Sequence, residues 1–397
     1  MNIQAKLMEK FLKNFDGTSF DVMFETGEEI HIGKEPSKFK VVVHEPVSYK
    51  KLLQSTTLAL GEAYMNGDLE IEGDIEIALN EIFKCQSEFK TNKNALRKIL
   101  FTSTSKKNQK KEVCSHYNIG NDFYSLWLDP TLSYSCAYFE TGNETLEQAQ
   151  HKKVCHILKK LNLKQGMSLL DIGCGWGFLL IEAAKKYKIH GVGITLSEQQ
   201  QKAFNERIKT EGLEAYLQVE LMDYRDLSKS GLKFDRVVSV GMLEHVGREN
   251  YDLFFKNVDS VLSDKGLFLL HFISGYGEYP GDAWIKKYIF PGGVIPSLRE
   301  IISLSADFKY YVLDVESLRR HYVRTLLCWH EGFEKHLPEI EKMFDEKFIR
   351  MWRMYLCSCA ASFNNGVIDL HQILFSKGVN NELPMTRGYQ YKSEQQN

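Results

Sequence analysis

The feature that most constrains the fold of this 397-residue chain is the run Leu-Leu-Asp-Ile-Gly-Cys-Gly-Trp-Gly at residues 169–177. Two apolar residues lead into an aspartate, and three glycines follow at alternate positions. Residues 178–187 behind the loop have the pattern of a helix. A strand, a tight glycine loop and a helix start in this order are typical of a doubly wound α/β fold that binds a nucleotide.

The spacing of the three glycines bears on the identity of the ligand. A dinucleotide-binding loop reads Gly-x-Gly-x-x-Gly, and its third glycine would fall at Phe178 in this chain. Because the observed Gly-x-Gly-x-Gly pattern need not accommodate a pyrophosphate, it favours S-adenosylmethionine over NAD. The loop alone leaves open a tight strand-to-helix turn without any ligand.

Strand and helix patterns alternate around this loop, which predicts an α/β domain with a mostly parallel sheet. The candidate strands are 167–171, 189–194, 215–219, 234–240, 266–273, 308–313 and 373–377. Ligands of such sheets lie beyond the carboxyl ends of the strands. We therefore expect Glu244 and His271, near the ends of two successive strands, to lie together beside a bound cofactor. The alternatives are a solvated carboxylate for Glu244 and a core histidine for His271.

Polar residues near two other strand ends are candidates for binding a nucleoside. Thr195 stands where many nucleotide sites have an acid that holds the ribose, so Thr195, or Gln199 and Gln200, would contact the ribose. Tyr224 would stack on the adenine.

The length of the chain predicts two domains. We place an N-terminal domain at 1–101, a basic linker at 102–112 and a catalytic domain at 113–397, with short strands expected at 20–24 and 38–44. The basic run 93–111 is either a solvated linker or a contact for an acidic membrane surface. The first helix, 3–15, carries Lys6, Lys10 and Lys13 beside an apolar face. It either packs on its own domain or lies on anionic lipid.

Composition excludes several classes of protein. A net charge of −2 gives no general attraction to nucleic acid. The eight cysteines form no paired zinc-type spacing, so we expect no metal site and a reduced, cytoplasmic environment. No apolar run is long enough to span a bilayer, so any contact with a membrane would be made from its surface.

Four separated motifs, at 117–124, 134–139, 170–177 and 241–247, resemble the cyclopropane-fatty-acyl-phospholipid synthase and mycolic acid cyclopropane synthase family. The resemblance extends from about residue 113 to the C-terminus and includes 286–292. Residues 61–67 also resemble the small N-terminal domain of the branch that acts on phospholipids.

This resemblance implies a Rossmann-like methyltransferase domain, a smaller α+β lipid-engaging domain, and S-adenosylmethionine as the cofactor. The substrate would be a cis double bond in an acyl chain of a membrane phospholipid. The enzyme would be a homodimer, peripheral on the inner face of the membrane. The implied cofactor-binding residues are Tyr134, Ser135, Leu169, Leu170, Asp171, Ile172, Gly173, Cys174, Gly175, Trp176, Gly177, Thr195, Leu196, Ser197, Glu198, Gln199, Gln200, Tyr224 and Arg225.

The resemblance also implies a bicarbonate ion beside the reacting carbons. The matching positions are Cys136, Glu244, His271, Ile273 and Tyr322, and Cys359 matches a cysteine assigned to the active site. Methylation of an alkene produces a cation that must lose a proton for the ring to close, and the bound anion would act as the base.

Three alternatives remain at this stage. Cys359 is either a nucleophile or a small buried side chain. Two alternatives to a cyclopropane synthase are an acyl C-methyltransferase that leaves a methyl branch and a lipid-binding protein without catalysis.

Overall fold

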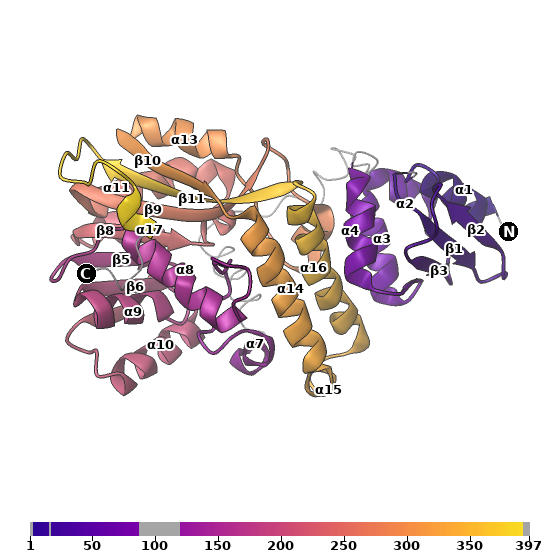
Figure 1. Ribbon diagram of the computed structural model, residues 1–397, viewed down its shortest axis with the longest axis horizontal. Helices are drawn as coiled ribbons and strands as arrows, with labels where there is room; N and C mark the ends of the chain where they lie inside the picture. The colour runs from indigo at the N-terminus through magenta and orange to yellow at the C-terminus, as the bar shows by residue number, and fades with distance from the viewer. Residues whose placement is uncertain (1–2, 16, 87–119, 392–397) are drawn as a thin grey trace. The chain divides into compact units, whose positions relative to one another are not determined.

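The computed structural model describes residues 3–15, 17–86 and 120–391 (Figure 1). The chain packs as two compact units. The first combines the described N-terminal residues with Pro280–Gly292 and Leu326–Val367. The second combines residues 120–279 with Gly293–Thr325 and the C-terminal part that begins at Ile368.

The second unit is built on a seven-stranded sheet with the order β10-β11-β9-β8-β5-β6-β7. Its strands are β5 (Ser168–Ile172), β6 (His190–Thr195), β7 (Leu217–Leu221), β8 (Phe234–Val240), β9 (Leu262–Gly275), β10 (Tyr310–Ser317) and β11 (Ile368–Lys377). Strands β7, β6, β5, β8 and β9 pair in parallel, and β11 pairs antiparallel with both β9 and β10. The mostly parallel sheet is confirmed, and each predicted strand overlaps an observed one. Strands β9, β10 and β11 extend four or five residues beyond their predicted bounds at one end.

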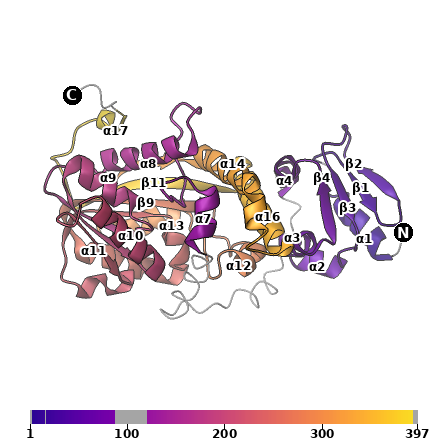
Figure 2. The same cartoon turned by 90° about the horizontal axis from the view of Figure 1, so that it is seen from below.

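Helices cover both faces of this sheet because its central strands are apolar on both sides. Leu169 packs in one core and Leu170 in the other. The first core takes α8 (Leu146–Lys160), α9 (Phe178–Tyr187) and α10 (Glu198–Thr210), and the second takes α11 (Tyr251–Val261) and α13 (Leu298–Asp307). Figure 2 shows α8 and α13 on opposite sides of β9 and β11. This is the doubly wound arrangement expected from the sequence.

The first unit contains a four-stranded sheet with the order β2-β1-β3-β4. Its strands are β1 (Phe20–Phe24), β2 (Glu29–Ile32), β3 (Lys40–Val43) and β4 (Leu69–Glu72), and its N-terminal helices are α1 (Ile3–Leu12), α2 (Tyr49–Gln54), α3 (Thr56–Asn66) and α4 (Ile75–Lys84). The strands predicted at 20–24 and 38–44 are present. Helix α1 buries Met8 and Phe11 in the core of the unit, so one face of it packs on its own domain, the first of the two alternatives.

Two later segments of the chain also belong to the first unit. They carry α12 (Ala283–Tyr288), α15 (Leu337–Ile340) and α16 (Glu346–Asn364). Arg350 of α16 donates hydrogen bonds to the backbone carbonyls of Tyr64 and Leu69, and its guanidinium lies 4.2 Å from the centre of the Tyr64 ring. The indole of Trp284 packs so closely on Gly61 that a Cβ there would lie 2.5 Å from the ring.

Packing therefore divides the chain differently from the linear division into 1–101 and 113–397. The linker predicted at 102–112, the basic run at 93–111 and the first residues of the 117–124 motif lie outside the described residues. Within the described part of the chain, no helix is both long enough and apolar enough to cross a membrane.

Candidate active site

The glycine loop begins directly after β5 and leads into α9. Gly173, Gly175 and Gly177 all have left-handed backbone conformations, with φ of 84°, 56° and 83°. The loop is held to the neighbouring strand because the amides of Gly173 and Cys174 both donate to the carbonyl of Ile194, at 3.0 and 3.1 Å. Gly177 has no room for a side chain, since a Cβ there would lie 2.1 Å from the ring of Phe204.

Trp176, the one bulky residue among the glycines, anchors the loop to α7 (Asn121–Trp127). Its indole nitrogen donates to Oδ1 of Asn121 at 3.1 Å, and its ring lies 5.8 Å from that of Tyr124. Tyr124 also contacts Tyr134, with ring centres 5.5 Å apart. Residues from three predicted motifs therefore meet at this loop.

Helix α8 positions the segment that contains Tyr134 and Ser135. The Nζ of Lys153 donates to Oγ of Ser135 at 2.9 Å, and the side-chain amide of Gln150 donates to the Ser135 carbonyl at 2.9 Å. Asp171, at the end of β5, is only 3% exposed, and its Oδ1 has no hydrogen-bond partner among the described residues. Burial raises the pKa of Asp171 to about 7, although Lys153 opposes the shift.

The end of β6 forms a closed turn before α10. The Thr195 hydroxyl donates to Oε1 of Gln200 at 2.7 Å and accepts from the Ser197 amide at 3.1 Å. Ser197 in turn caps α10, while Gln199 is exposed and Leu196 half-buried. These contacts already engage the Thr195 hydroxyl and one oxygen of Gln200. Contact of Thr195, or of Gln199 and Gln200, with a ribose stays a prediction.

Tyr224 begins the 3-10 helix η2 (Tyr224–Lys229) after β7. Its ring is 7% exposed and meets the ring of Phe254 edge-on, 5.4 Å between centres. Arg225 is held by two hydrogen bonds to Asp223, at 2.9 and 2.6 Å. Stacking of Tyr224 on an adenine likewise stays a prediction.

Glu244 and His271 are brought together by the pairing of β8 with β9. Val240 is opposite His271 in the register, and the Gly241 amide donates to the His271 carbonyl at 2.8 Å. Glu244 follows in the 3-10 helix η3 (Leu243–His245), and its Oε1 accepts the Ile273 amide at 2.6 Å. Glu244, His271 and Ile273 therefore share the carboxyl edge of the sheet, where the sequence led us to expect the first two.

The side chains of Glu244 and His271 are both buried, and each has one polar atom without a partner among the described residues. Glu244 is 9% exposed, and its Oε2 has no partner among the described residues; burial raises its pKa to about 7. His271 is 1% exposed, and burial holds its pKa well below the ordinary value, so the ring is neutral at pH 7. The Gln372 amide, as placed, donates to Nδ1 at 3.1 Å, which leaves the ring proton on the unpartnered Nε2. The site thus offers one buried acceptor and one buried donor.

Cys136 and Tyr322 both contact the backbone of Leu318, which lies next to the strand that pairs with Ile273. The Leu318 carbonyl accepts the Tyr322 amide at 3.1 Å and lies 3.9 Å from the Cys136 sulfur. The Leu318 amide donates to Leu370, which is opposite Ile273 in the register of β11 and β9. Cys136 is fully buried, and burial raises the pKa of its thiol, so it has no thiolate character at neutral pH.

Cys359 lies on α16 in the first unit, whereas every other predicted site residue belongs to the second. It is half-buried, and burial raises the pKa of its thiol to about 12. A thiol with such a pKa is protonated at neutral pH, which disfavours a nucleophilic role.

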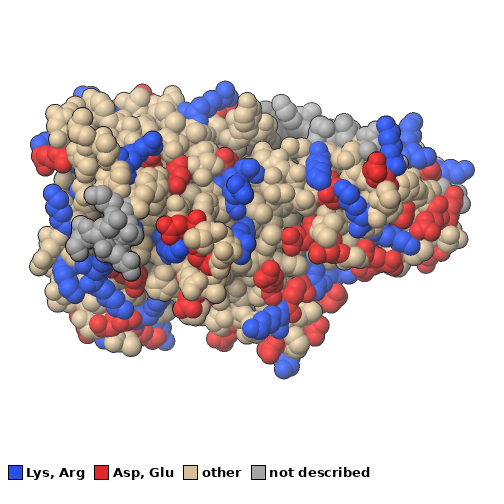
Figure 3. Space-filling model, viewed as in Figure 1, with Lys and Arg blue, Asp and Glu red and all other residues tan. Residues whose placement is uncertain are grey.

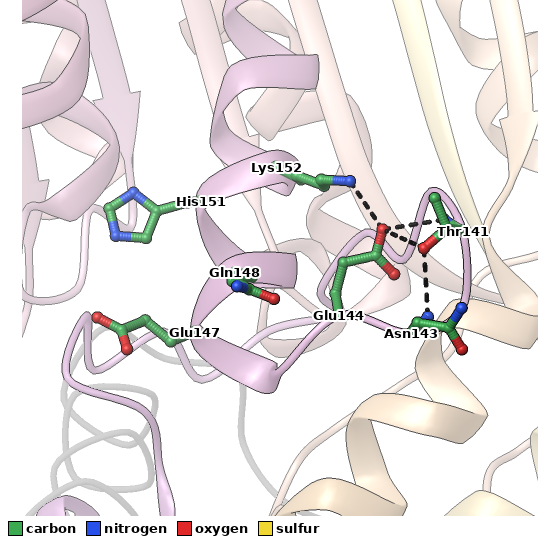
Figure 4. A pocket seen from close by; sticks show the side chains of 7 residues that line it. All are labelled: Thr141, Asn143, Glu144, Glu147, Gln148, His151 and Lys152. Atoms are coloured by element: carbon green, nitrogen blue, oxygen red, sulfur yellow. Dashed lines mark hydrogen bonds and ion pairs between the residues drawn. The ribbon is translucent and has the colours of Figure 1, made fainter.

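A surface pocket of about 590 Å³ near α8 differs from this site in its chemistry (Figure 4). Glu144, one of its lining residues, accepts hydrogen bonds from Lys152 and from the Thr141 amide, at 2.7 and 2.9 Å. Burial opposes these bonds, but they lower the pKa of Glu144 to about 2. Because Glu144 and Lys152 already pair with each other, this pocket is not our candidate for catalysis.

The residues around the glycine loop fit S-adenosylmethionine. The loop presents backbone without side-chain bulk, and Asp171 presents a buried, unpartnered oxygen beside it. Sequence reasoning missed Gln150, Lys153 and Gln372, which support Ser135 and His271. The sequence does indicate that Gln150 and Lys153 are buried, since both fall on the same face of α8 as the apolar residues Val154 and Ile157.

Comparison with known proteins bears on both units. Residues 104–373 match the family described as mycolic acid cyclopropane synthetase, and residues 7–94 match a domain of unknown function (DUF7884). A probable fatty acid methyltransferase of Pseudomonas putida is 38% identical, with 96% of each chain covered. The cyclopropane-fatty-acyl-phospholipid synthase of Escherichia coli K12 is 41% identical over 89% of this chain and 92% of its own.

Solved structures agree with these sequence matches. The cyclopropane synthase MmaA2 from Mycobacterium tuberculosis has a TM-score of 0.64 at 34% identity, with 68% of this chain and 98% of that chain covered. Mycolic acid cyclopropane synthase CmaA1, complexed with S-adenosylhomocysteine (SAH) and CTAB, has the same TM-score, identity and coverage. The chain therefore belongs to the mycolic acid cyclopropane synthase family of S-adenosylmethionine-dependent methyltransferases.

Proposed function

We propose that this enzyme adds a methylene group to the cis double bond of an unsaturated phospholipid acyl chain and forms a cyclopropane ring. The observation that carries the proposal is the pair Glu244 and His271 at the carboxyl edge of the sheet, each buried with an unpartnered polar atom. Two polar atoms left unpaired in a core cost free energy, so a ligand that satisfies them is the simplest reason for their presence.

The proposed reaction needs a methyl donor and a route for one proton. When bound, S-adenosylmethionine supplies a methyl group activated by a sulfonium. The alkene carbon forms a bond to that methyl carbon as the carbon–sulfur bond breaks, which leaves a cation on the acyl chain. Loss of a proton from the new methyl group then lets the second carbon–carbon bond close the ring. The neutral His271 adds no positive charge that would repel the cation.

Glu244, His271 and Tyr322 would hold a bicarbonate ion, with the backbone around Cys136 and Ile273 beside it. Such an ion both donates and accepts hydrogen bonds, which matches the His271 Nε2–H donor and the Glu244 Oε2 acceptor. The ion would supply the base for the proton. Activity that is unchanged in bicarbonate-depleted buffer would contradict this role.

The test of the whole proposal is incubation with vesicles of unsaturated phospholipid and S-adenosylmethionine labelled in its methyl group. We expect label in the acyl chains and the upfield proton resonances of a cyclopropane in their NMR spectrum. Unlabelled lipid would contradict enzymatic function on this substrate and would favour a lipid-binding protein without catalysis.

A second candidate is an acyl C-methyltransferase, which the likeness to the probable fatty acid methyltransferase of P. putida favours. It would use the same cofactor site but lose the proton without closing a ring. The ring and the methyl-bearing alkene have the same mass, so the NMR spectrum, not mass alone, distinguishes the two candidates.

We also propose that the first unit meets an anionic membrane surface through α1 and α2. Helix α1 exposes Ile3 and Leu7, which are 79% and 36% accessible, together with the side chains of Lys6 and Lys10. Exposed apolar residues flanked by lysines are typical of an interfacial helix.

Helix α2 packs against α1. It exposes Leu53, 43% accessible, beside Lys50 and Lys51. Figure 3 shows Lys and Arg side chains along the edge of this unit that carries α1 and α2. Each basic residue near anionic lipid contributes about 1 kcal/mol.

Cosedimentation with phosphatidylglycerol vesicles measures this contact. Reversal of Lys6 and Lys10 to Glu is expected to weaken binding at least about tenfold, whereas Lys202→Glu with Lys209→Glu, exposed positions on α10, leaves it nearly unchanged. Equal effects of the two pairs would contradict a contact through α1. Attachment to the inner face of the membrane and a homodimer are further parts of the proposal, to be measured by cell fractionation and light scattering.

A further inference from the structure

Lys153 is a buried cation that has a hydrogen-bond partner but no ion-pair partner among the described residues. Its side chain is 4% exposed, and its Nζ donates to Oγ of Ser135. No carboxylate among the described residues lies within ion-pair distance of this Nζ. Burial of an ammonium group without a paired anion is costly, so an anion that binds beside it would stabilise the arrangement.

Two other lysines of α8 show the contrast. Lys160 is also buried, but it pairs with Asp314 at 3.0 Å and with Glu316 at 2.5 Å. Lys152 lines the surface pocket of Figure 4, where it pairs with Glu144 at 2.7 Å. It also pairs with Glu140 at 2.8 Å. Both have carboxylate partners within the protein, and Lys153 has a hydroxyl.

Two buried carboxyl groups near Lys153 each have an acceptor oxygen without a partner among the described residues. Asp129 and Asp171 are 6% and 3% exposed, and each has one oxygen without a partner among the described residues. Lys153 is close enough to both to oppose the rise in pKa that burial causes in their carboxyl groups. Asp171 stands directly before the glycine loop, so this charged cluster lies at the end of the cofactor site.

We propose that Lys153 is a positioning residue for the amino-acid end of S-adenosylmethionine. An ammonium group only donates, so Ser135 Oγ accepts from Lys153 and its own hydrogen is left to donate to the α-carboxylate. The unpartnered oxygen of Asp171 would accept the α-ammonium. The inference rests on S-adenosylmethionine as the cofactor and is independent of the acyl substrate.

The test compares two ligands by titration calorimetry. SAH carries the amino-acid end, and 5′-methylthioadenosine keeps the adenosine and the thioether without it. Lys153→Met, which has similar length and no charge, is expected to weaken SAH about tenfold to a hundredfold, as for a lost hydrogen bond to a charged group. Affinity for methylthioadenosine is expected to change less than about twofold.

Lys152→Met is the matched control and is expected to leave both affinities unchanged, because Lys152 pairs with Glu140 and Glu144 and not with Ser135. Ser135→Ala removes only the hydroxyl, so it tests the inference even if Lys153→Met fails to fold. It should weaken SAH selectively, and the double variant should bind SAH little worse than the poorer single variant.

Equal weakening of both ligands by Lys153→Met, or unchanged SAH affinity in Ser135→Ala, would overturn the inference. Wild-type protein that binds neither ligand would count against the cofactor itself, a separate failure.

Discussion

The proposed role of Glu244 implies that its burial lowers stability at neutral pH while serving the reaction, and Glu244→Gln tests both effects. Burial raises the pKa of this carboxyl group from its ordinary 4.5 to about 7. Between these pH values the folded state binds a proton that the unfolded state has released, so the free energy of unfolding falls as the pH rises. At 1.36 kcal/mol per pH unit, the loss between pH 4.5 and pH 7 is about 3 kcal/mol.

Glutamine keeps the shape and the acceptor for the Ile273 amide but does not titrate. The wild type should therefore lose about 3 kcal/mol relative to Glu244→Gln between pH 4.5 and pH 8. Any constant cost of burying the new amide cancels from this comparison. The variant should retain SAH binding and lose methyl transfer, because the buried carboxylate oxygen is gone.

The assay is urea denaturation of both proteins at several pH values. Pulsed thiol labelling of Cys136 and Cys174, which are buried in the second unit, reports the unfolding of that unit. Glu249→Gln, an exposed neighbour, is the control and should parallel the wild type. A difference between wild type and Glu244→Gln that stays constant across pH would refute the reasoning.

Three further variants test other parts of the site. Gly177→Ala should lower the free energy of unfolding in the urea assay by roughly 2–5 kcal/mol, because it combines a left-handed backbone with a clash against Phe204. Gly175→Ala has the same kind of backbone but meets open space, so it should cost roughly 1–2 kcal/mol. Equal losses in the two variants would contradict the packing argument. Cys359→Ser should retain nearly full activity in the vesicle assay, because burial raises the pKa of the thiol to about 12 and so disfavours a thiolate nucleophile. A loss of activity would again favour a nucleophilic role for Cys359. Trp176→Phe should weaken SAH binding several-fold in calorimetry, because the bond to Asn121 worth about 1 kcal/mol is lost while the aromatic ring remains; unchanged affinity would show that the loop does not need this anchor.

Much of the second unit could be predicted from local patterns. Apolar runs bounded by turn residues marked its strands, and the glycine spacing marked the loop, because both follow from backbone geometry within a few residues. Glu244 and His271 could be placed together because parallel strands present their carboxyl ends at one edge. Contact of Thr195 with a ribose and stacking of Tyr224 on an adenine stay predictions.

Other features were decided by contacts between distant parts of the chain. The sequence by itself determined the sheet, the loop and the edge where the site lies. Only the tertiary structure decided that Lys153 holds Ser135, that Gln372 orients His271, and that residues near 284 and 350 pack with the first helices. The reason is physical: a strand or a glycine turn follows from its own residues, whereas the burial of a polar side chain and its partner depend on which remote segments surround it.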